Sequence, residues 1–201
     1  MRGLTGEFDE PEDSDRCRAL TAAWARNWPD ADPVGHRLRV AYADRWVRFH
    51  NLPESKRYAE SPEEHAEIIH RQRTVLTELL DGVALEHLVV LAKDWGPQDL
   101  ATGRSRRYVR GAWPWRRVDD DDPELGSAYL WARTELDGPH LDALLLAIAD
   151  DQAVAILAGP DLGWLFCPYD GGVDIILPGS EARDALRDRH TEWLSAQPSG
   201  L

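Results

Sequence analysis

Residues 152–177 read QAVAILAGPDLGWLFCPYDGGVDIIL, and this stretch decides the fold class. It holds three short apolar segments with the length and composition of β-strands. These segments are residues 152–158, 163–168 and 172–177. They are separated by Asp161-Leu162-Gly163 and Asp170-Gly171-Gly172, which suit tight turns because Gly and Asp adopt positive φ angles at little cost. Such short turns cannot carry a parallel crossover, so we expect an antiparallel meander.

Upstream of the meander, the sequence predicts helices and further strands. Ser61, Pro62 and Glu64 mark a helix start, because Ser caps the first turn, Pro fits the first helical position and Glu can bond back to the cap. Apolar residues then recur at helical spacing until Gly82 ends the helix. By the same criteria we expect further helices at 15–27, at 139–149 and after a side-chain cap at Ser180. We expect strands at 36–41, 45–52, 88–92 and 127–136.

The order of these elements predicts the α+β class, with a mostly antiparallel sheet packed against about four helices. The elements do not alternate strictly between strand and helix, as they do in parallel α/β sheets. Residues 14–196 are expected to form a single domain, a size that one hydrophobic core can support. Residues 1–13 are polar and acidic and are expected to form a mobile arm. Residues 96–126 lack clear periodicity and are expected to form an irregular loop region.

The charge balance limits the kinds of partner. The chain of 201 residues has 36 Asp and Glu against 23 Lys and Arg, so its formal net charge is -13. Nucleic acids and anionic membranes attract clustered Lys and Arg, so we expect neither as a partner. Complementary charge favours a basic protein instead. With two distant cysteines and no secretory or membrane-spanning segment, we expect a cytoplasmic protein that needs no cofactor.

A basic segment in this acidic chain is the first candidate site. Residues 46–58 read WVRFHNLPESKRY. Its candidates for contacting a carboxylate or phosphate group are Arg48, His50, Ser55, Lys56, Arg57 and Tyr58. Arg57 can bind such an anion through two N–H groups, and His50 can act as an acid or base because its reference pKa lies near neutrality. The alternative is that Glu54 and Glu60 neutralise the cations, so that no ligand is needed.

A second candidate site combines tryptophan and acidic residues of the irregular region. Three of the nine Trp fall in or beside expected loops, where exposed Trp can serve as a binding hot spot. An acidic run follows, and it is expected to form an exposed loop because clustered carboxylates cannot be packed without counter-charges. The candidate partner-binding residues are Trp95, Trp113, Trp115, Asp119, Asp120, Asp121 and Asp122. The alternative is that Trp-Pro-Trp at 113–115 folds back onto the sheet.

Metal and catalytic signatures are weak. Glu67 and His70 have the spacing of ligands on one helix face, but no second copy completes a di-iron site. The sequence has no nucleophile elbow and no glycine-rich phosphate loop. We therefore predict no metal site and assign no catalytic residue.

Two segments together resemble a known family. Residues 46–58 resemble the RFHSLPxSKRY segment of an uncharacterised bacterial domain family common in actinobacteria. Residues 164–176, WLFCPYDGGVDII, resemble its YDxGxDII segment. The resemblance covers about residues 34–195 and implies no activity or catalytic residue.

Some small acidic domains of this general kind resemble immunity proteins that neutralise toxins. By that analogy we predict a cytosolic interaction domain, of the immunity type, that binds a basic protein. The alternative is an enzyme or small-ligand binder that uses the basic segment on an anionic group.

Overall fold

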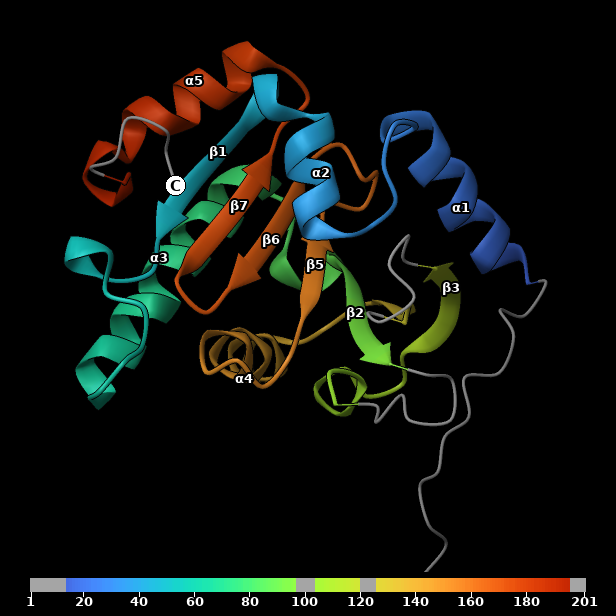
Figure 1. Ribbon diagram of the computed structural model, residues 1–201, viewed down its shortest axis with the longest axis horizontal. Coiled ribbons are helices and arrows are strands. Elements are labelled where there is room, and N and C mark those ends of the chain that lie inside the picture. Colours follow the sequence, from blue (N-terminus) through green and yellow to red (C-terminus); the bar gives the residue numbers. More distant parts are fainter. Residues whose placement is uncertain (1–13, 97–103, 120–125, 196–201) are drawn as a thin grey trace, which may run out of the picture.

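The computed structural model describes residues 14–96, 104–119 and 126–195. In these residues seven strands form one sheet, in the order β1-β7-β6-β5-β2-β4-β3, and every neighbouring pair is antiparallel (Figure 1). The strands are β1 (Trp46–His50), β2 (Val89–Gly96), β3 (Trp113–Asp119), β4 (Ser127–Thr134), β5 (Ala155–Ala158), β6 (Leu165–Tyr169) and β7 (Gly172–Ile176). The predicted α+β class is confirmed.

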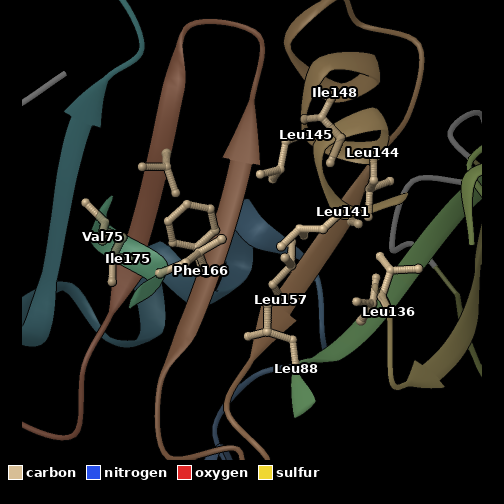
Figure 2. Close-up of a cluster of buried hydrophobic side chains, with 14 of the residues drawn as sticks. Val75, Leu88, Leu136, Leu141, Leu144, Leu145, Ile148, Leu157, Phe166 and Ile175 are labelled. Carbon is tan, nitrogen blue, oxygen red and sulfur yellow. The ribbon is translucent and has the colours of Figure 1, made fainter. Parts of the chain in front are cut away.

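Helices cover both faces of the sheet and give three layers. The helices are α1 (Asp15–Asn27), α2 (Gly35–Ala41), α3 (Pro62–Leu80), α4 (Gly138–Ala149) and α5 (Ser180–Arg189). One core lies between the sheet and α3, α4 and α5, and Figure 2 shows part of it. A second core lies between the opposite face and α1 and α2. None of the described helices is long and apolar enough to span a membrane.

The predicted start and end of α3 are confirmed. Ser61 Oγ accepts a hydrogen bond from the Glu64 N–H at 3.3 Å, and Pro62 occupies the first turn. The Glu64 carboxylate accepts the N–H of Glu60 at 2.6 Å. The chain leaves the helix through Asp81, which adopts the left-handed conformation with a φ of 45°. α5 differs, because it begins after Gly179 and the expected Ser180 side-chain cap is wrong.

The predicted meander is confirmed as β5-β6-β7. Cys167 of β6 lies opposite Asp174 of β7, and Phe166 lies opposite Ile175. Phe166 and Ile175 face α3 and α4, whereas Cys167 faces α2, so adjacent residues enter different cores. Gly172 has no alternative at its position, because a Cβ there would collide with the backbone of β1.

The strand expected at 36–41 is wrong, because residues 35–41 form α2. Val34, Leu38 and Tyr42 are all buried, and this four-residue spacing places them on one side of a helical turn. Val40 points away from the sheet and is 76% exposed. A strand would have required alternate burial along the segment.

The irregular region expected at 96–126 is partly wrong. Trp113 and Trp115 lie in β3, which pairs with β4. Trp95, which was expected beside a loop, lies in β2. The register shifts between Pro114 and Arg116, because proline has no N–H to donate to the ladder. This bulge hides the strand periodicity from the sequence. The expected arm at 1–13 lies outside the described residues.

Candidate functional site

Arg48 of the first motif forms a two-point ion pair with Asp174 of the second. Arg48 Nε lies 2.7 Å from Asp174 Oδ1, and Nη2 lies 2.9 Å from Oδ2. The two side chains are only 12% and 11% exposed. The Tyr169 ring lies 4.9 Å from the guanidinium. The pair therefore joins the edge strand β1 to β7 rather than pointing to solvent.

Arg57 and Tyr58 both engage Asp170 in the β6–β7 turn. Arg57 Nε donates to Asp170 Oδ2, and the Tyr58 hydroxyl donates to the same oxygen at 2.9 Å. This hydrogen bond raises the pKa of Tyr58. Asn51 donates through Nδ2 to the carbonyl oxygens of Tyr169 and Asp170. The loop that carries the first motif is thus fixed to the second motif.

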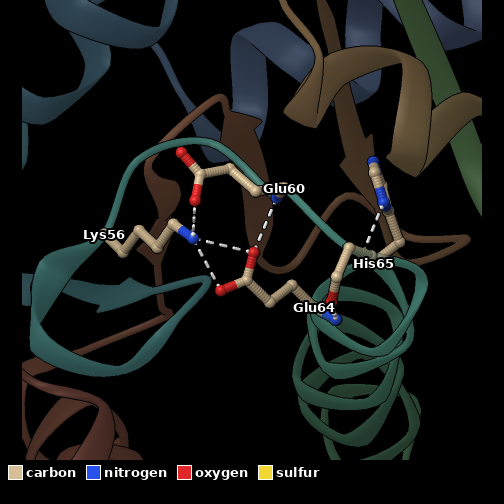
Figure 3. Close-up of polar contacts among 5 residues, drawn as sticks. Lys56, Glu60, Glu64 and His65 are labelled. Atoms are coloured by element: carbon tan, nitrogen blue, oxygen red, sulfur yellow. Dashed lines mark hydrogen bonds and ion pairs between the residues drawn. The ribbon is translucent and has the colours of Figure 1, made fainter.

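Lys56 is held by two glutamates at the start of α3 (Figure 3). Its Nζ lies 2.7 and 2.9 Å from the Glu64 carboxylate oxygens and 2.9 Å from Glu60 Oε2. The hydrogen bonds that Lys56 donates to Glu64 and Glu60 raise its pKa. Every Lys and Arg of the basic segment, Arg48 and Arg57 included, therefore faces a carboxylate of the same chain.

A pocket of about 450 Å³ lies beneath the same loop. We call it the motif pocket, and its lining residues are His50, Leu52, Glu54, Ser55, Arg71, Glu192, Trp193 and Leu194. Its base is formed by buried side chains of Leu52, Arg71 and Trp193. Its exposed rim includes Glu54 and Glu192. Of the six residues predicted for the first site, this pocket brings together only His50 and Ser55.

Arg71 is the cation of the motif pocket, and it is 8% exposed. Its Nε donates to Glu67 Oε1 at 2.6 Å, and its Nη1 donates to the His50 carbonyl oxygen at 3.2 Å. The guanidinium lies 5.5 Å from the centre of the Trp193 ring. An arginine side chain carries five N–H donors, and these two bonds use two of them. The other three have no protein acceptor among the described residues.

Sequence reasoning missed Arg71, although a signal existed. It lies three residues after Ile68 and four before Val75, two buried positions of the α3 stripe. A charged residue on the apolar face of a helix needs a partner there, because an unpaired buried charge is costly.

His50 adds a neutral polar group. Its Nε2 is buried and has no hydrogen-bond partner among the described residues. Burial lowers the pKa of His50, so its imidazole is uncharged at neutral pH.

The pocket rim is conformationally strained. Glu54 and Ser55 are consecutive non-glycine residues with φ angles of 56° and 58°. Each such residue costs about 1–3 kcal/mol, and strain of this kind gathers at ligand-binding sites. The contacts of the neighbouring residues Lys56 and Arg57 hold the loop in this shape.

The second predicted site has a different structure from the expected loop. Trp115 is 2% exposed, packs 5.7 Å from Trp24 and donates through Nε1 to Thr21 Oγ1. Trp95 and Trp113 are partly buried against the same core. Exposed Asp119 accepts bonds from Arg117 and Ser127, while Asp120, Asp121 and Asp122 lie outside the described residues. A partner-binding role for these residues stays a prediction.

Side chains that could perform chemistry are scattered. In the described parts of the chain, no three His, Cys, Asp or Glu side chains cluster closely enough to hold a metal ion. Within the motif pocket, neither His50 nor Ser55 hydrogen-bonds through its side chain to another lining side chain in the described residues. The arrangement offers hydrogen-bond donors and acceptors for a bound ligand.

Comparison with known proteins identifies a family. The model described as a domain of unknown function (DUF3885) matches residues 34–198. The match spans both motifs and every strand of the sheet, whereas α1 precedes it. Neither the curated proteins nor the solved structures contain a match.

Proposed function

The chain belongs to the DUF3885 family, a domain of unknown function, and we propose from its geometry that it is a binding domain for a zwitterionic ligand. The ligand occupies the motif pocket. Its class is a free amino acid with an apolar side chain. No reaction is assigned to the pocket.

The buried guanidinium of Arg71 carries this proposal. It lines the pocket, has spare N–H donors and is only 8% exposed, so few water molecules compete for it. A carboxylate matches the fork of an arginine through two parallel hydrogen bonds, which makes it the preferred ligand group. Arg71 thus takes the role that the sequence suggested for Arg57.

The rim carboxylates favour a zwitterion over a simple anion. Glu54 and Glu192 would repel a ligand that carries only negative charge, and they attract an ammonium group beside the carboxylate. Leu52, Trp193 and Leu194 supply apolar surface for a side chain. The pocket volume of about 450 Å³ lies in the ordinary range of small-molecule sites.

The proposal is tested with the protein labelled with 5-fluorotryptophan and observed by ¹⁹F NMR. The Trp193→Phe variant identifies the Trp193 resonance. We expect L-leucine to shift this resonance saturably. N-acetyl-leucine lacks the positive charge of leucine, and leucinamide lacks its negative charge. We therefore expect both compounds to bind at least tenfold more weakly than leucine.

Two matched variants complete the test. Arg71→Met removes the ligand-facing cation and is expected to abolish the shift. Arg73→Met removes a cation of the same helix outside the pocket and is expected to retain it. Equal binding by wild type and Arg71→Met, or no movement of Trp193 with any of the three compounds, contradicts the proposal.

A second candidate function is the immunity-type interaction with a basic protein in the cytoplasm. The net charge of -13 favours it, as does the pairing of Arg48, Lys56 and Arg57 with carboxylates of the same chain. A pull-down from the native cell at low and high salt tests it. A basic partner that is released by salt and binds the Arg71→Met variant equally well supports this function over the first.

A further inference from the structure

Lys93 is a buried cation that no carboxylate of the described residues contacts. It lies in β2, is 8% exposed, and shares with Val89 and Leu91 the face that packs against α1 and α2. Among the described residues its ammonium group forms no ion pair and no hydrogen bond. Its Nζ lies 4.8 Å from the centre of the Trp95 ring.

Among the described residues, Arg37 adds positive charge near Lys93, although it also lies 3.7 Å from the Asp32 carboxylate. Arg37 of α2 and Cys167 of β6 are the titratable groups that act on it, and burial raises the pKa of the Cys167 thiol, so that side chain is neutral. Asp174, opposite Cys167, is already bound at both oxygens by Arg48 and lies 3.9 Å from Arg39.

An ammonium in this position is energetically costly. Removing it from water without a counter-charge costs several kcal/mol in proteins. Burial accordingly lowers the pKa of Lys93 to about 8, so it still carries its charge for most of the time at pH 7. An anion that reached Nζ would replace the lost hydration.

We propose that Lys93 forms a binding site for the phosphate or carboxylate group of a small molecule, and that the positive charge of Arg37 nearby favours the anion. The site lies on the α2 side of the sheet, whereas Arg71 and Trp193 of the motif pocket belong to the α3 side. It therefore does not depend on the proposed function. Trp95, which is only partly buried, forms its wall toward the surface.

The chain permits a clean test, because Lys56 and Lys93 are its only lysines. Protein labelled with ¹³Cε-lysine gives one signal for each, and the Lys93→Met variant assigns them. The probes are sodium phosphate and sodium acetate, each compared with sodium chloride at the same ionic strength. We expect phosphate or acetate to shift the Lys93 signal saturably, while the Lys56 signal, already held by Glu60 and Glu64, stays in place.

Variants separate binding from a structural role. Phosphate-dependent or acetate-dependent thermal stabilisation should fall at least tenfold in apparent affinity in Lys93→Met, and should persist in Lys93→Arg and in the control Lys56→Met. Arg71→Met should keep the Lys93 shift, which distinguishes this site from the motif pocket. The proposal is overturned if neither lysine signal moves, if both move alike, or if Lys93→Met binds as wild type does.

Discussion

Replacing Arg48 with Met should destabilise the protein strongly, because Arg48 neutralises buried Asp174 across the β1–β7 pair. In this variant the Asp174 carboxylate keeps only the more distant Arg39 among the described residues, whose Nη1 lies 3.9 Å from Oδ2. Breaking a buried ion pair by removing one partner costs about 3–5 kcal/mol. Since Arg39 offers partial compensation, we expect about 3 kcal/mol.

The assay is urea denaturation of the single variants and of the Arg48→Met/Asp174→Asn double variant. The double variant removes both charges, so its cost should be smaller than the sum of the single costs by about 2 kcal/mol. Arg73→Met is the matched control, because Arg73 pairs with Asp142 in a far more exposed position. We expect that control to cost less than about 1 kcal/mol.

Two results would refute this reasoning. One is an Arg48→Met variant as stable as the Arg73→Met control. The other is strict additivity in the double-variant cycle, which would mean that Arg48 and Asp174 do not stabilise each other. If Arg48→Met instead folded normally and lost anion binding, Arg48 would be a ligand-binding residue, as the sequence suggested.

Three further predictions concern particular positions. Gly172→Ala should lower the free energy of unfolding by about 3 kcal/mol or more, as measured by urea denaturation, because the new Cβ would collide with the Phe49 carbonyl oxygen. Gly179→Ala is the control and should be nearly neutral, because the space around its Cβ is open. Equal effects of the two substitutions would contradict this. Lys93→Met should be more stable than wild type at pH 7 by about 3 kcal/mol, the free energy that corresponds to lowering the pKa from 10.5 to about 8. The unfolded chain binds the Lys93 proton more tightly, so wild-type stability should rise between about pH 8 and 10.5 and the advantage of Met should shrink there; a constant advantage would contradict the burial argument. Ser55→Gly should relieve the strain at a φ of 58° and stabilise the protein by about 0.5–1 kcal/mol. The same variant should weaken the leucine-induced shift of the Trp193 resonance. A loss of stability would show that the loop is unstrained.

Local signals in the sequence predicted α3 and the β5-β6-β7 meander. Their caps, periodicity and turn residues lie within a few residues of one another, so no distant contact is needed to interpret them. The sequence of α2 resembles a strand because its seven residues make less than two helical turns. The four-residue spacing of buried positions that indicates a helix depends on Val34 and Tyr42, which lie just outside α2. β3 was hidden because Pro114 interrupts its ladder.

The candidate site was predicted only in part, for a related reason. The basic segment was recognised from its composition, but its ion pairs join residues far apart, such as Arg48 and Asp174, which are separated by 126 positions. Nothing in the spacing of a single sequence reveals that partner. Arg71 could have been found as a charge on the buried α3 stripe, whereas Trp193 reaches the pocket only through the packing of the chain after α5.

The central claim is that Arg71 binds the carboxylate of a zwitterionic ligand in the motif pocket. A crystal structure of the protein soaked with L-leucine tests it most directly. We predict electron density for leucine in the pocket, with its carboxylate within hydrogen-bond distance of Arg71 and its ammonium group directed toward Glu54 or Glu192. An empty pocket in leucine-soaked crystals, or leucine bound there without contact to Arg71, would contradict the claim.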